Sequence, residues 1–537
     1  MPTFAAIDIG SNSCRLAIAA VQQHHLKMLH EDREVTRLGE SVFDTGLISP
    51  EAMANTIRAL KRFQKAVQAQ VVDRVRVVAT SAMRDARNSE AFRAWVKSAT
   101  GWTVEVISGL EEGRLIHLGV ATHEPGARGR CLLIDLGGGS CEVTLSDHGR
   151  IQQMVSLPLG AVRLQQEFLR ADPPGKEDVA RLRKYIDREL RKAERKFGHL
   201  RVPLVIATSG TAAALAEASA ALEAGGKKGI KGVKGIKGIK GIRGKAAAKK
   251  VSSVKPRGVL TAQTPGVRRL ADRLLKLSNA QRAVVPGIGP RRSEIICGGA
   301  QVYAALLERM ELKGFRYSRL GLRDGVLAQM LADVDVRASV HRTLEAERWR
   351  GVLEVCRRYG FDPRKAEPER LHVVQLFDQM QPVHELPREY RLWLQAAAMM
   401  QEVGKFMNHQ GHHRHTQYII ANSEIFGFSP EQRAVVAAIA RYLGKSRPEA
   451  VDRTMRAVPL EEHVNVERAV VLLRMAQALN QDRATASVRI RTAVYPKRVV
   501  LELVPARGGG ELEQWSLKKE AAYFREVFRR ELLVEVV

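Results

Sequence analysis

The sequence has no long apolar segment and few cysteines. No uncharged apolar run reaches about 18 residues, the length that a membrane-spanning helix needs. Close to Met1 the apolar stretch is interrupted by Asp8, and no basic cluster precedes it, so this segment does not resemble a secretory signal. The cysteines are odd in number and follow no Cys-x-x-Cys pattern: Cys14, Cys131, Cys141, Cys297 and Cys356. Such cysteines are typical of a reducing compartment, and the sequence therefore predicts a cytoplasmic protein without membrane association.

Aromatic residues are scarce as well. They make up 5% of 537 residues, so we expect cores built mainly from Leu, Val, Ile and Ala. With 45% hydrophobic and 27% charged residues, the composition excludes a wholly disordered or fibrous chain. The length predicts about three or four domains. Acidic residues are outnumbered, since 86 Lys and Arg stand against 58 Asp and Glu, and the net charge of +28 predicts a polyanionic ligand.

One segment carries much of this charge. Residues 227–257 contain twelve Lys or Arg and no acidic residue, and removing them leaves 74 basic against 58 acidic residues, or +16, elsewhere. Glycine recurs at every third position, but without the proline of a collagen helix this segment is typical of a low-complexity loop. We therefore predict a Lys/Gly-rich insert at residues 225–258. Its role is open between a tolerated surface insertion and a tether for an anion.

The N-terminal half alternates strand-like and helix-like stretches, which is typical of α/β folds. Within it, residues 5–13 read AAIDIGSNS and residues 132–140 read LLIDLGGGS. Both place Asp after three apolar residues and a Gly-containing turn before a second apolar run, which predicts a β-hairpin. A hairpin that recurs about 130 residues later indicates two similar domains.

The pattern changes after about residue 333. Heptad-like apolar spacing predicts helices there, as in residues 344–359 and 391–407. From about residue 487 the segments 488–494 and 499–504 alternate like strands, and residues 518–530 have helical spacing. We expect a small α+β unit at this end of the sequence.

The two hairpin turns are suited to phosphate. Their small residues leave backbone N–H groups accessible, and three glycines at 137–139 leave no side chain to block an anion. The aspartate at the end of each first strand, Asp8 or Asp135, is suited to a phosphate-bound Mg²⁺. Residues 207–211 place hydroxyls before a predicted helix, which fits an anion site or an ordinary N-cap. Arg84 either binds a further phosphate or is solvated.

Glu111 and Glu112 are the acid–base candidates. A glutamate that faces a phosphate cleft can accept a proton from a water that attacks phosphorus. The alternative is a glutamate that only interacts with the dipole at the start of a helix. Spacing does not decide between the two residues.

Together these motifs resemble the exopolyphosphatase/guanosine pentaphosphatase family, within the actin–sugar kinase–chaperone superfamily. The resemblance spans about the first 330 residues, in blocks at 8–13, 79–85, 106–114, 135–142, 156–162, 208–211 and 321–327. It implies an α/β fold with a duplicated actin-like (ribonuclease H-like) core of the ATPase type, followed by an all-α HD-like domain and a small α+β C-terminal domain. The implied ranges are 1–123 and 124–332 for the two actin-like domains, 333–480 for the HD-like domain and 481–537 for the C-terminal domain.

The resemblance also implies roles for single residues. Glu112 would be the catalytic base, and Asp135 and Glu142 would hold a divalent cation, Mg²⁺ or another such as Mn²⁺. The phosphate track would be lined by Asn12, Ser13, Arg84, Gly137, Gly138, Gly139, Ser140, Ser209, Gly210 and Thr211.

The helical part departs from the HD pattern. His372 matches a first metal ligand, but the expected His-Asp pair reads Gln401-Glu402, which removes a histidine ligand. Four histidines within residues 409–415 resemble a metal site, yet such a site needs converging ligands with supporting carboxylates. We therefore expect a structural or chain-gripping role for this domain rather than metal-dependent hydrolysis.

The implied activity is that of an exopolyphosphatase, the metal-dependent hydrolytic release of terminal orthophosphate from inorganic polyphosphate. The alternative on the same site is 5′-phosphohydrolysis of guanosine pentaphosphate. A rival from another class is a non-catalytic polyanion-binding protein, and the intact Glu112, Asp135 and Glu142 argue against it. A kinase of the same superfamily is a third possibility. The resemblance further implies a homodimer, and we expect no nucleic acid as a specific partner.

Overall fold

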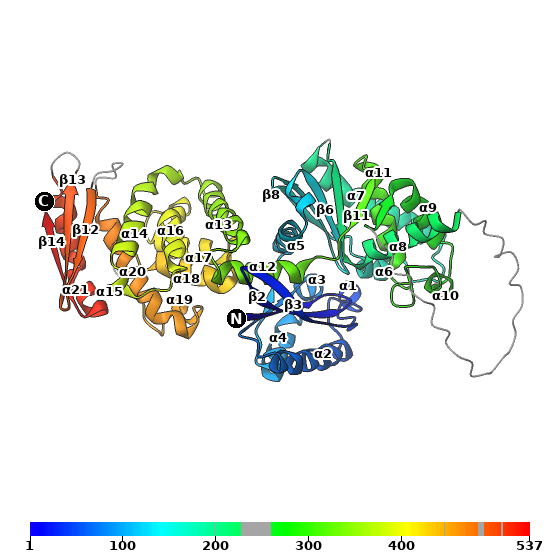
Figure 1. The fold of residues 1–537 in the computed structure, drawn as a ribbon, viewed down its shortest axis with the longest axis horizontal. Coiled ribbons are helices and arrows are strands. Elements are labelled where there is room, and N and C mark those ends of the chain that lie inside the picture. The colour runs from blue at the N-terminus through cyan, green and yellow to red at the C-terminus, as the bar shows by residue number, and fades with distance from the viewer. Residues whose placement is uncertain (199, 227–258, 445, 482–487, 506–508) are drawn as a thin grey trace, which may run out of the picture. The chain divides into compact units, whose positions relative to one another are not determined.

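The computed structural model describes residues 1–198, 200–226, 259–444, 446–481, 488–505 and 509–537. From position 227 to 258 the predicted Lys/Gly-rich insert lies outside these residues. The chain divides into two compact units, Met1–Val340 and His341–Val537 (Figure 1). The four predicted domain ranges are finer than this division and stay predictions.

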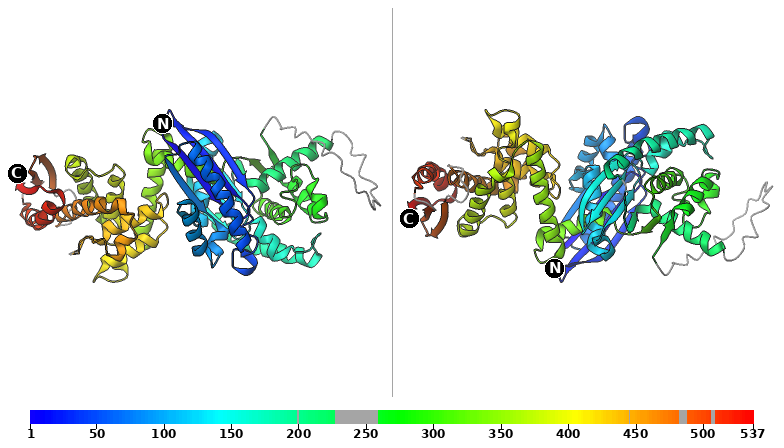
Figure 2. Two further views of the ribbon diagram at one scale, coloured as in Figure 1. Left: turned by 90° about the horizontal axis from the view of Figure 1, so that it is seen from below. Right: turned by 90° about the horizontal axis from the view of Figure 1, so that it is seen from above.

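A five-stranded mixed sheet forms the first half of the N-terminal unit. Its elements are β1 (Thr3–Ile9), β2 (Cys14–Gln22), β3 (His25–Glu34), α1 (Val42–Thr45), α2 (Pro50–Ala69), β4 (Arg74–Ala79), α3 (Ser81–Asp85), α4 (Ser89–Thr100) and β5 (Val104–Val106). The strand order is β3-β2-β1-β4-β5, with β1 antiparallel to β2 and parallel to β4, so the predicted first hairpin is confirmed. Helix α2 lies along one face of the sheet, where Ile57, Leu60 and Phe63 join the core (Figures 1 and 2).

A second sheet of six strands follows. Its elements are α5 (Gly109–His123), β6 (Cys131–Leu136), β7 (Cys141–Asp147), β8 (Arg150–Leu157), α6 (Ala161–Phe168), α7 (Lys176–Phe197), β9 (Leu204–Thr208), α8 (Ser209–Gly226), β10 (Thr261–Gln263), α9 (Thr264–Leu274), α10 (Asn279–Ala283), α11 (Ile296–Arg309), β11 (Gly314–Tyr317) and α12 (Leu322–Val334). The order is β10-β11-β9-β6-β7-β8. Strands β8-β7-β6-β9 repeat the order and directions of β3-β2-β1-β4. The two sheets therefore share a topology, as the recurring hairpin indicates.

Two helices each pack on the sheet of the other half of the N-terminal unit. Helix α5 follows the first sheet in the chain but packs on β6, β7 and β8, whereas α12 follows the second sheet and packs on β1, β2 and β3. The two helices also touch each other at glycines. An ideal Cβ at Gly325 would lie 1.8 Å from the carbonyl oxygen of Leu115, and one at Gly119 would lie 2.6 Å from the backbone nitrogen of Gly325. The contact leaves no room for a side chain and ties the two sheets together.

Replacing Gly325 with Ala is expected to destabilise the N-terminal unit by at least about 1–3 kcal/mol, because the new methyl group forces the two backbones apart. The measurement is thermal or urea unfolding. Gly266→Ala in α9 is the matched control, since an ideal Cβ there meets nothing within 4 Å. Equal stability of the Gly325→Ala variant and the wild type would contradict the close contact.

The C-terminal unit consists of helices and a small sheet with one continuous core. Its elements are α13 (Ser339–Arg358), α14 (Glu367–Gln379), α15 (Gln381–His384), α16 (Tyr390–Met400), α17 (His412–Asn422), α18 (Pro430–Arg441), α19 (Arg453–Arg456), α20 (His463–Ala478), β12 (Val488–Val494), β13 (Arg498–Pro505), α21 (Glu511–Phe528) and β14 (Glu531–Val536), in a sheet of order β12-β13-β14. One hydrophobic core includes residues from Val352 to Val534. The helices and the small sheet share it, since α14 contacts β12 and α20 contacts α21. The predicted helix at 518–530 begins earlier, at Glu511, directly after Gly510 in a left-handed conformation (φ 105°).

Two of the absences noted in the sequence recur in the structure. In the part of the chain that the structure describes, no helix combines the length and the apolar character that crossing a membrane requires. All five cysteines are buried and none is in a disulfide.

Candidate functional site

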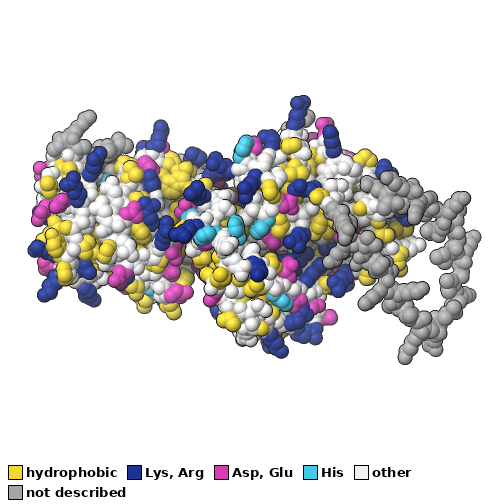
Figure 3. Space-filling model, viewed as in Figure 1, with side chains coloured by type: hydrophobic (Ala, Val, Ile, Leu, Met, Phe, Trp, Pro, Cys, Tyr) yellow, Lys and Arg dark blue, Asp and Glu magenta, His cyan; other side chains and the backbone are white. Residues whose placement is uncertain are grey.

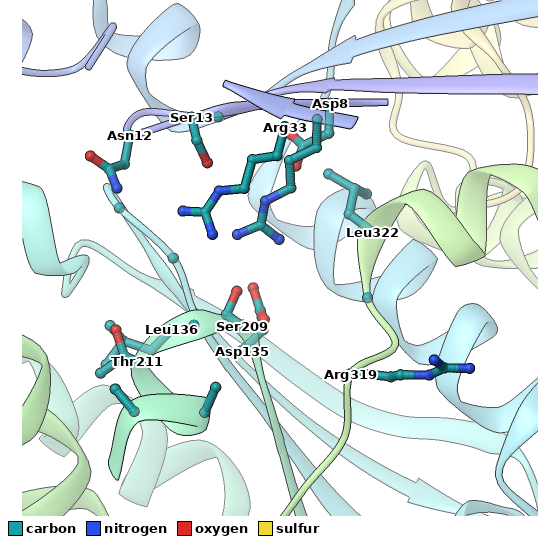
Figure 4. Close-up of a pocket in the computed structure, with 18 of the residues that line it drawn as sticks. Asp8, Asn12, Ser13, Arg33, Asp135, Leu136, Ser209, Thr211, Arg319 and Leu322 are labelled. Atoms are coloured by element: carbon teal, nitrogen blue, oxygen red, sulfur yellow. The ribbon is translucent and has the colours of Figure 1, made fainter. Parts of the chain in front are cut away.

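A cavity of about 780 Å³ opens between the two sheets of the N-terminal unit. The turns of both predicted hairpins line it, together with the turn from β9 into α8. Asn12 and Ser13 face Asp135, Ser209 and Thr211 across the cavity (Figure 4). The predicted site residues in its lining are Asn12, Ser13, Glu112, Asp135, Gly137, Gly138, Ser209, Gly210 and Thr211.

The two hairpins share a turn hydrogen bond but differ in charge. In the first turn Gly10 N donates to Ser13 O at 3.2 Å, and in the second Gly137 N donates to Ser140 O at 3.0 Å. The aspartate that ends each first strand faces a different residue across the hairpin: Asp8 pairs with Arg15, whereas Asp135 pairs with Glu142. The first hairpin thus presents one carboxylate and one guanidinium to the cavity, while the second gathers carboxylates.

Three buried carboxylates converge at the second hairpin. Glu112 comes from the first turn of α5, Asp135 from the end of β6 and Glu142 from the start of β7. Each offers an oxygen atom, and these atoms all lie within 4.8 Å of one another. Glu142 is 1% exposed and lies behind the cavity lining, with Oε2 lacking a hydrogen-bond partner among the described residues. Hard oxygen ligands in this arrangement are suited to a divalent cation.

Burial changes the ionisation of all three groups. It raises the pKa of Glu112 to about 7, and the nearby Arg84 opposes that rise. Burial also raises the pKa of Glu142 well above its usual value, with the charges of Glu112 and Asp135 adding to the effect. Burial also raises the pKa of Asp135, and the hydroxyl of Thr208, which donates to Oδ1, opposes this rise only in part. The site therefore favours protonation or a bound cation over three free negative charges.

Arg84 holds Glu112 rather than lining the cavity. Its Nη1 donates to Oε2 of Glu112 at 3.0 Å and to the carbonyl of Ile107 at 2.8 Å, while Nη2 donates to Ser140 Oγ at 3.3 Å. Arg84 and Ser140, both predicted to bind phosphate, are not among the residues that line the cavity. Gly139 is not among the lining residues either, and it packs closely on Ser81, whose Oγ would lie 2.3 Å from an ideal Cβ at this position.

Glu111 and Glu112 have different surroundings. Glu111 accepts two hydrogen bonds of 2.8 Å from the buried Arg114, whereas Glu112 lines the cavity. The spacing leaves the choice open, and these contacts engage Glu111 in an ion pair with Arg114, outside the residues that line the cavity.

The turn from β9 into α8 is strained at Ser209. This residue has φ of 68°, an uncommon value for a residue other than glycine, at the start of an 18-residue helix. The N-terminus of a helix attracts anions, and Thr211 of the same turn also lines the cavity. Gly210 makes room for an arginine, because an ideal Cβ there would lie 1.4 Å from Nη2 of Arg292.

A group of arginines that no sequence pattern indicates lines the cavity. The group consists of Arg15, Arg33, Arg291, Arg292, Arg319 and Arg323. The side chain of Arg33 extends from β3 into the cavity between the two sheets (Figure 4). Burial and then the charges of Arg33 and Arg15 lower the pKa of Arg292 to about 10, which shows that the guanidinium groups repel one another.

These arginines offer free positive charge. Among the described residues Arg323 forms an ion pair, with Glu31 at 3.1 Å, and the other five are in none within 4 Å. On the face shown in Figure 3, Lys and Arg are interspersed with Asp and Glu. The arginine group is suited to a ligand with several negative charges.

The residues of the C-terminal unit that resemble metal ligands do not form a comparable group. His372 is buried and its Nε2 lies 3.1 Å from the carbonyl oxygen of Val488. Gln401, which replaces the expected histidine, donates to Glu369. Among the described residues, the carboxylates of Glu112, Asp135 and Glu142 are the one group of three or more converging ligands, and His409, His412, His413 and His415 do not belong to it.

Two models of known protein families together match nearly the whole chain. The model of the Ppx/GppA phosphatase family matches residues 17–334, and the model of Ppx/GppA phosphatase domain III matches residues 348–525. The first match contains all the residues of the carboxylate group and most of the arginine group.

Solved structures give a similar result for the N-terminal part. An exopolyphosphatase from Cytophaga hutchinsonii is 24% identical with a TM-score of 0.53, over 62% of this chain and 99% of its own. An exopolyphosphatase-like protein is 26% identical with a TM-score of 0.52, over 60% and 96% of the two chains. The Ppx/GppA family member of Aquifex aeolicus is 29% identical with a TM-score of 0.49, over 62% and 99%. The first two support a shared fold for the mixed α/β core.

Proposed function

Because the chain belongs to the Ppx/GppA phosphatase family, we propose that it is an exopolyphosphatase, which hydrolyses the terminal phosphoanhydride bond of inorganic polyphosphate and releases orthophosphate. The observation that carries this proposal is the contrast within one cavity. A group of buried carboxylates lies at the second hairpin, and six arginines, five of them in no ion pair among the described residues, also line the cavity. The carboxylates suit a reacting phosphate with its cation, and the arginines suit further phosphates of the same molecule.

The proposed cation is Mg²⁺ or another divalent ion such as Mn²⁺. Asp135 and Glu142 would hold it, and the residues fit, because Glu142 Oε2 is buried without a hydrogen-bond partner among the described residues and its neighbours are acidic. When bound, the cation would neutralise charge on the phosphate that reacts. The remaining chemistry belongs to side chains of this chain.

Glu112 is the proposed base. Its carboxylate lines the cavity and, with a pKa of about 7, can accept a proton from a water near neutral pH. Arg84 fixes its orientation through the 3.0 Å contact to Oε2. The backbone N–H groups of residues 137 and 138 and the start of α8 would hold the phosphate that the water attacks. Catalysis would then rest largely on positioning of the water and phosphates.

A second candidate is 5′-phosphohydrolysis of guanosine pentaphosphate, and one observation favours it. A second cavity of about 560 Å³ adjoins the first and shares Asn12, Arg33, Arg291 and Ile295 with it. Apolar surface in its lining comes from Val35, Val162 and Pro290. The nucleoside of guanosine pentaphosphate could pack on this surface, whereas a polyphosphate chain has no apolar group to pack there.

We also propose that the C-terminal unit is an HD-like domain with a structural or chain-gripping role. The match to domain III and the replacement of a ligand by Gln401 support this. A homodimer, as the family resemblance implies, stays part of the proposal. The five cysteines without disulfides support a cytoplasmic location.

The test is orthophosphate release from long-chain polyphosphate and from guanosine pentaphosphate in parallel, at equal concentrations of chain ends, with Mg²⁺ or with EDTA. We expect faster release from polyphosphate and none in EDTA. Faster release from the nucleotide would favour the second candidate. Binding of polyphosphate without release from either substrate would overturn both and indicate a polyanion-binding protein.

A further inference from the structure

We propose that Ser156 is a positioning residue for the divalent cation, because it fixes the carboxylate of Glu142. This inference rests on the proposed role of Glu142 as a cation ligand. Ser156 lies on β8, directly opposite Glu142 on β7 in the antiparallel register. Its Oγ donates to Glu142 Oε1 at 2.7 Å. Oε1 is thereby occupied, and Oε2 is left as the oxygen without a hydrogen-bond partner among the described residues.

The start of α5 holds this pair in place. An ideal Cβ at Gly109 would lie 2.1 Å from Ser156 Oγ, 2.6 Å from Ser156 Cβ and 3.5 Å from Glu142 Oε1. Only a residue without a side chain allows the helix to begin so close to the two groups. The same first turn of α5 carries Glu112, so its contact with Ser156 brings Glu112 within reach of Glu142.

The other proposed cation ligand has a similar support. Thr208, at the end of β9, donates its hydroxyl hydrogen to Asp135 Oδ1 across the parallel pair with β6. Each ligand thus accepts a hydrogen bond from a hydroxyl on the neighbouring strand of the same sheet. Such outer partners orient metal ligands, and losing one typically lowers metal affinity about 10–100-fold. Ser156 carries the inference for two reasons. Glu142 is the more buried of the two ligands. Among the described residues, Ser156 is also the one side chain that donates a hydrogen bond to the carboxylate of Glu142.

The test is titration of the full-length protein with Mn²⁺ in the absence of substrate, with free Mn²⁺ followed by its paramagnetic resonance signal. We expect Ser156→Ala to raise the dissociation constant about 10–100-fold and Glu142→Gln to abolish this binding. Ser219→Ala is the matched control, since it also removes a buried hydroxyl, one without a hydrogen-bond partner among the described residues. Thermal unfolding in EDTA checks that each variant is folded.

The outcomes separate two failures. If Glu142→Gln binds Mn²⁺ like the wild type, the cation lies elsewhere and the proposed role of Glu142 is wrong. If Glu142→Gln loses the ion but Ser156→Ala binds it like the wild type, Ser156 does not position the ligand and this inference is overturned. A positioning role also predicts that orthophosphate release by Ser156→Ala returns to within about 3-fold of the wild type at saturating Mg²⁺, because the reacting groups are intact. Persistent loss of release at saturating Mg²⁺ would contradict the inference.

Discussion

Replacement of Glu112 by Gln is expected to lower the rate constant of orthophosphate release about 10²–10⁴-fold, the range that a positioned general base contributes. The amide would keep the shape of the side chain and one hydrogen-bond acceptor for Arg84 but could not take the proton of the attacking water. Substrate binding should be unchanged or tighter, because a negative charge is removed from a cavity that binds an anion. The measurement is kcat and KM for the substrate that the wild type prefers.

Glu111→Gln is the matched control for this experiment. It makes the same chemical change one residue away, at a carboxylate that accepts two hydrogen bonds from Arg114. Because Arg114 is 1% exposed, this variant should lose stability, seen as a lower Tm, and keep its kcat. If Glu111→Gln loses the activity and Glu112→Gln keeps it, the base has been assigned to the wrong residue.

The parts of the site that are close in the sequence could be predicted from it. The repeated Asp-x-Gly-x-x-Ser pattern predicted two hairpins, and their turns do meet at one cavity. The interval from Asp135 to Glu142 is that of a tight antiparallel hairpin, which places both carboxylates opposite each other. Hairpin geometry depends on a few neighbouring residues, and for that reason a local pattern is enough to predict it.

The arginine group could not be predicted in this way. Arg15 and Arg33 come from the first sheet, whereas Arg291 and Arg292 lie more than 250 residues later, just before α11. No spacing rule connects them, and each alone resembles an ordinary solvated side chain. The contact of Arg84 with Glu112 could not be predicted for a related reason. Sequence cannot tell whether a guanidinium near a strand end faces a ligand or a neighbouring glutamate.

Buried like charges have a cost that the fold must bear. One oxygen atom each of Glu112, Asp135 and Glu142 lies within 4.8 Å of the others, and all three residues are buried. Burial without a countercharge disfavours ionised carboxylates, and their mutual repulsion adds to that cost. A site built to hold a cation is therefore expected to be a weak point of the fold when the cation is removed.

Glu142→Gln is accordingly expected to change activity and stability in opposite directions. Orthophosphate release should fall about 10³-fold, because the variant lacks one of the two proposed cation ligands and metal ions contribute several kcal/mol to such reactions. In EDTA at neutral pH, the variant should instead unfold at a higher temperature than the wild type. The buried carboxyl of Glu142 has a pKa well above its usual value, so folding at neutral pH opposes its ionisation, and an amide has no such cost.

The sign of the pH dependence gives this prediction its sharpest form. The pKa of Glu142 is raised in the folded state. Ionisation of this group therefore does not lower the free energy of unfolding of the wild type at pH values below about 4.5, the usual pKa of a glutamate. The free energy of unfolding then decreases as pH rises toward the folded-state pKa. In EDTA the difference in Tm between Glu142→Gln and the wild type should therefore widen as pH rises. Glu177→Gln, which removes the same charge from an exposed position on α7, should show no such widening. Added Mg²⁺ should raise the Tm of the wild type and leave that of Glu142→Gln unchanged, because binding to the folded state alone stabilises it. If Mg²⁺ stabilises both proteins equally, Glu142 does not hold the cation. If the variant is the less stable one in EDTA, the buried carboxylate of Glu142 does not destabilise the fold.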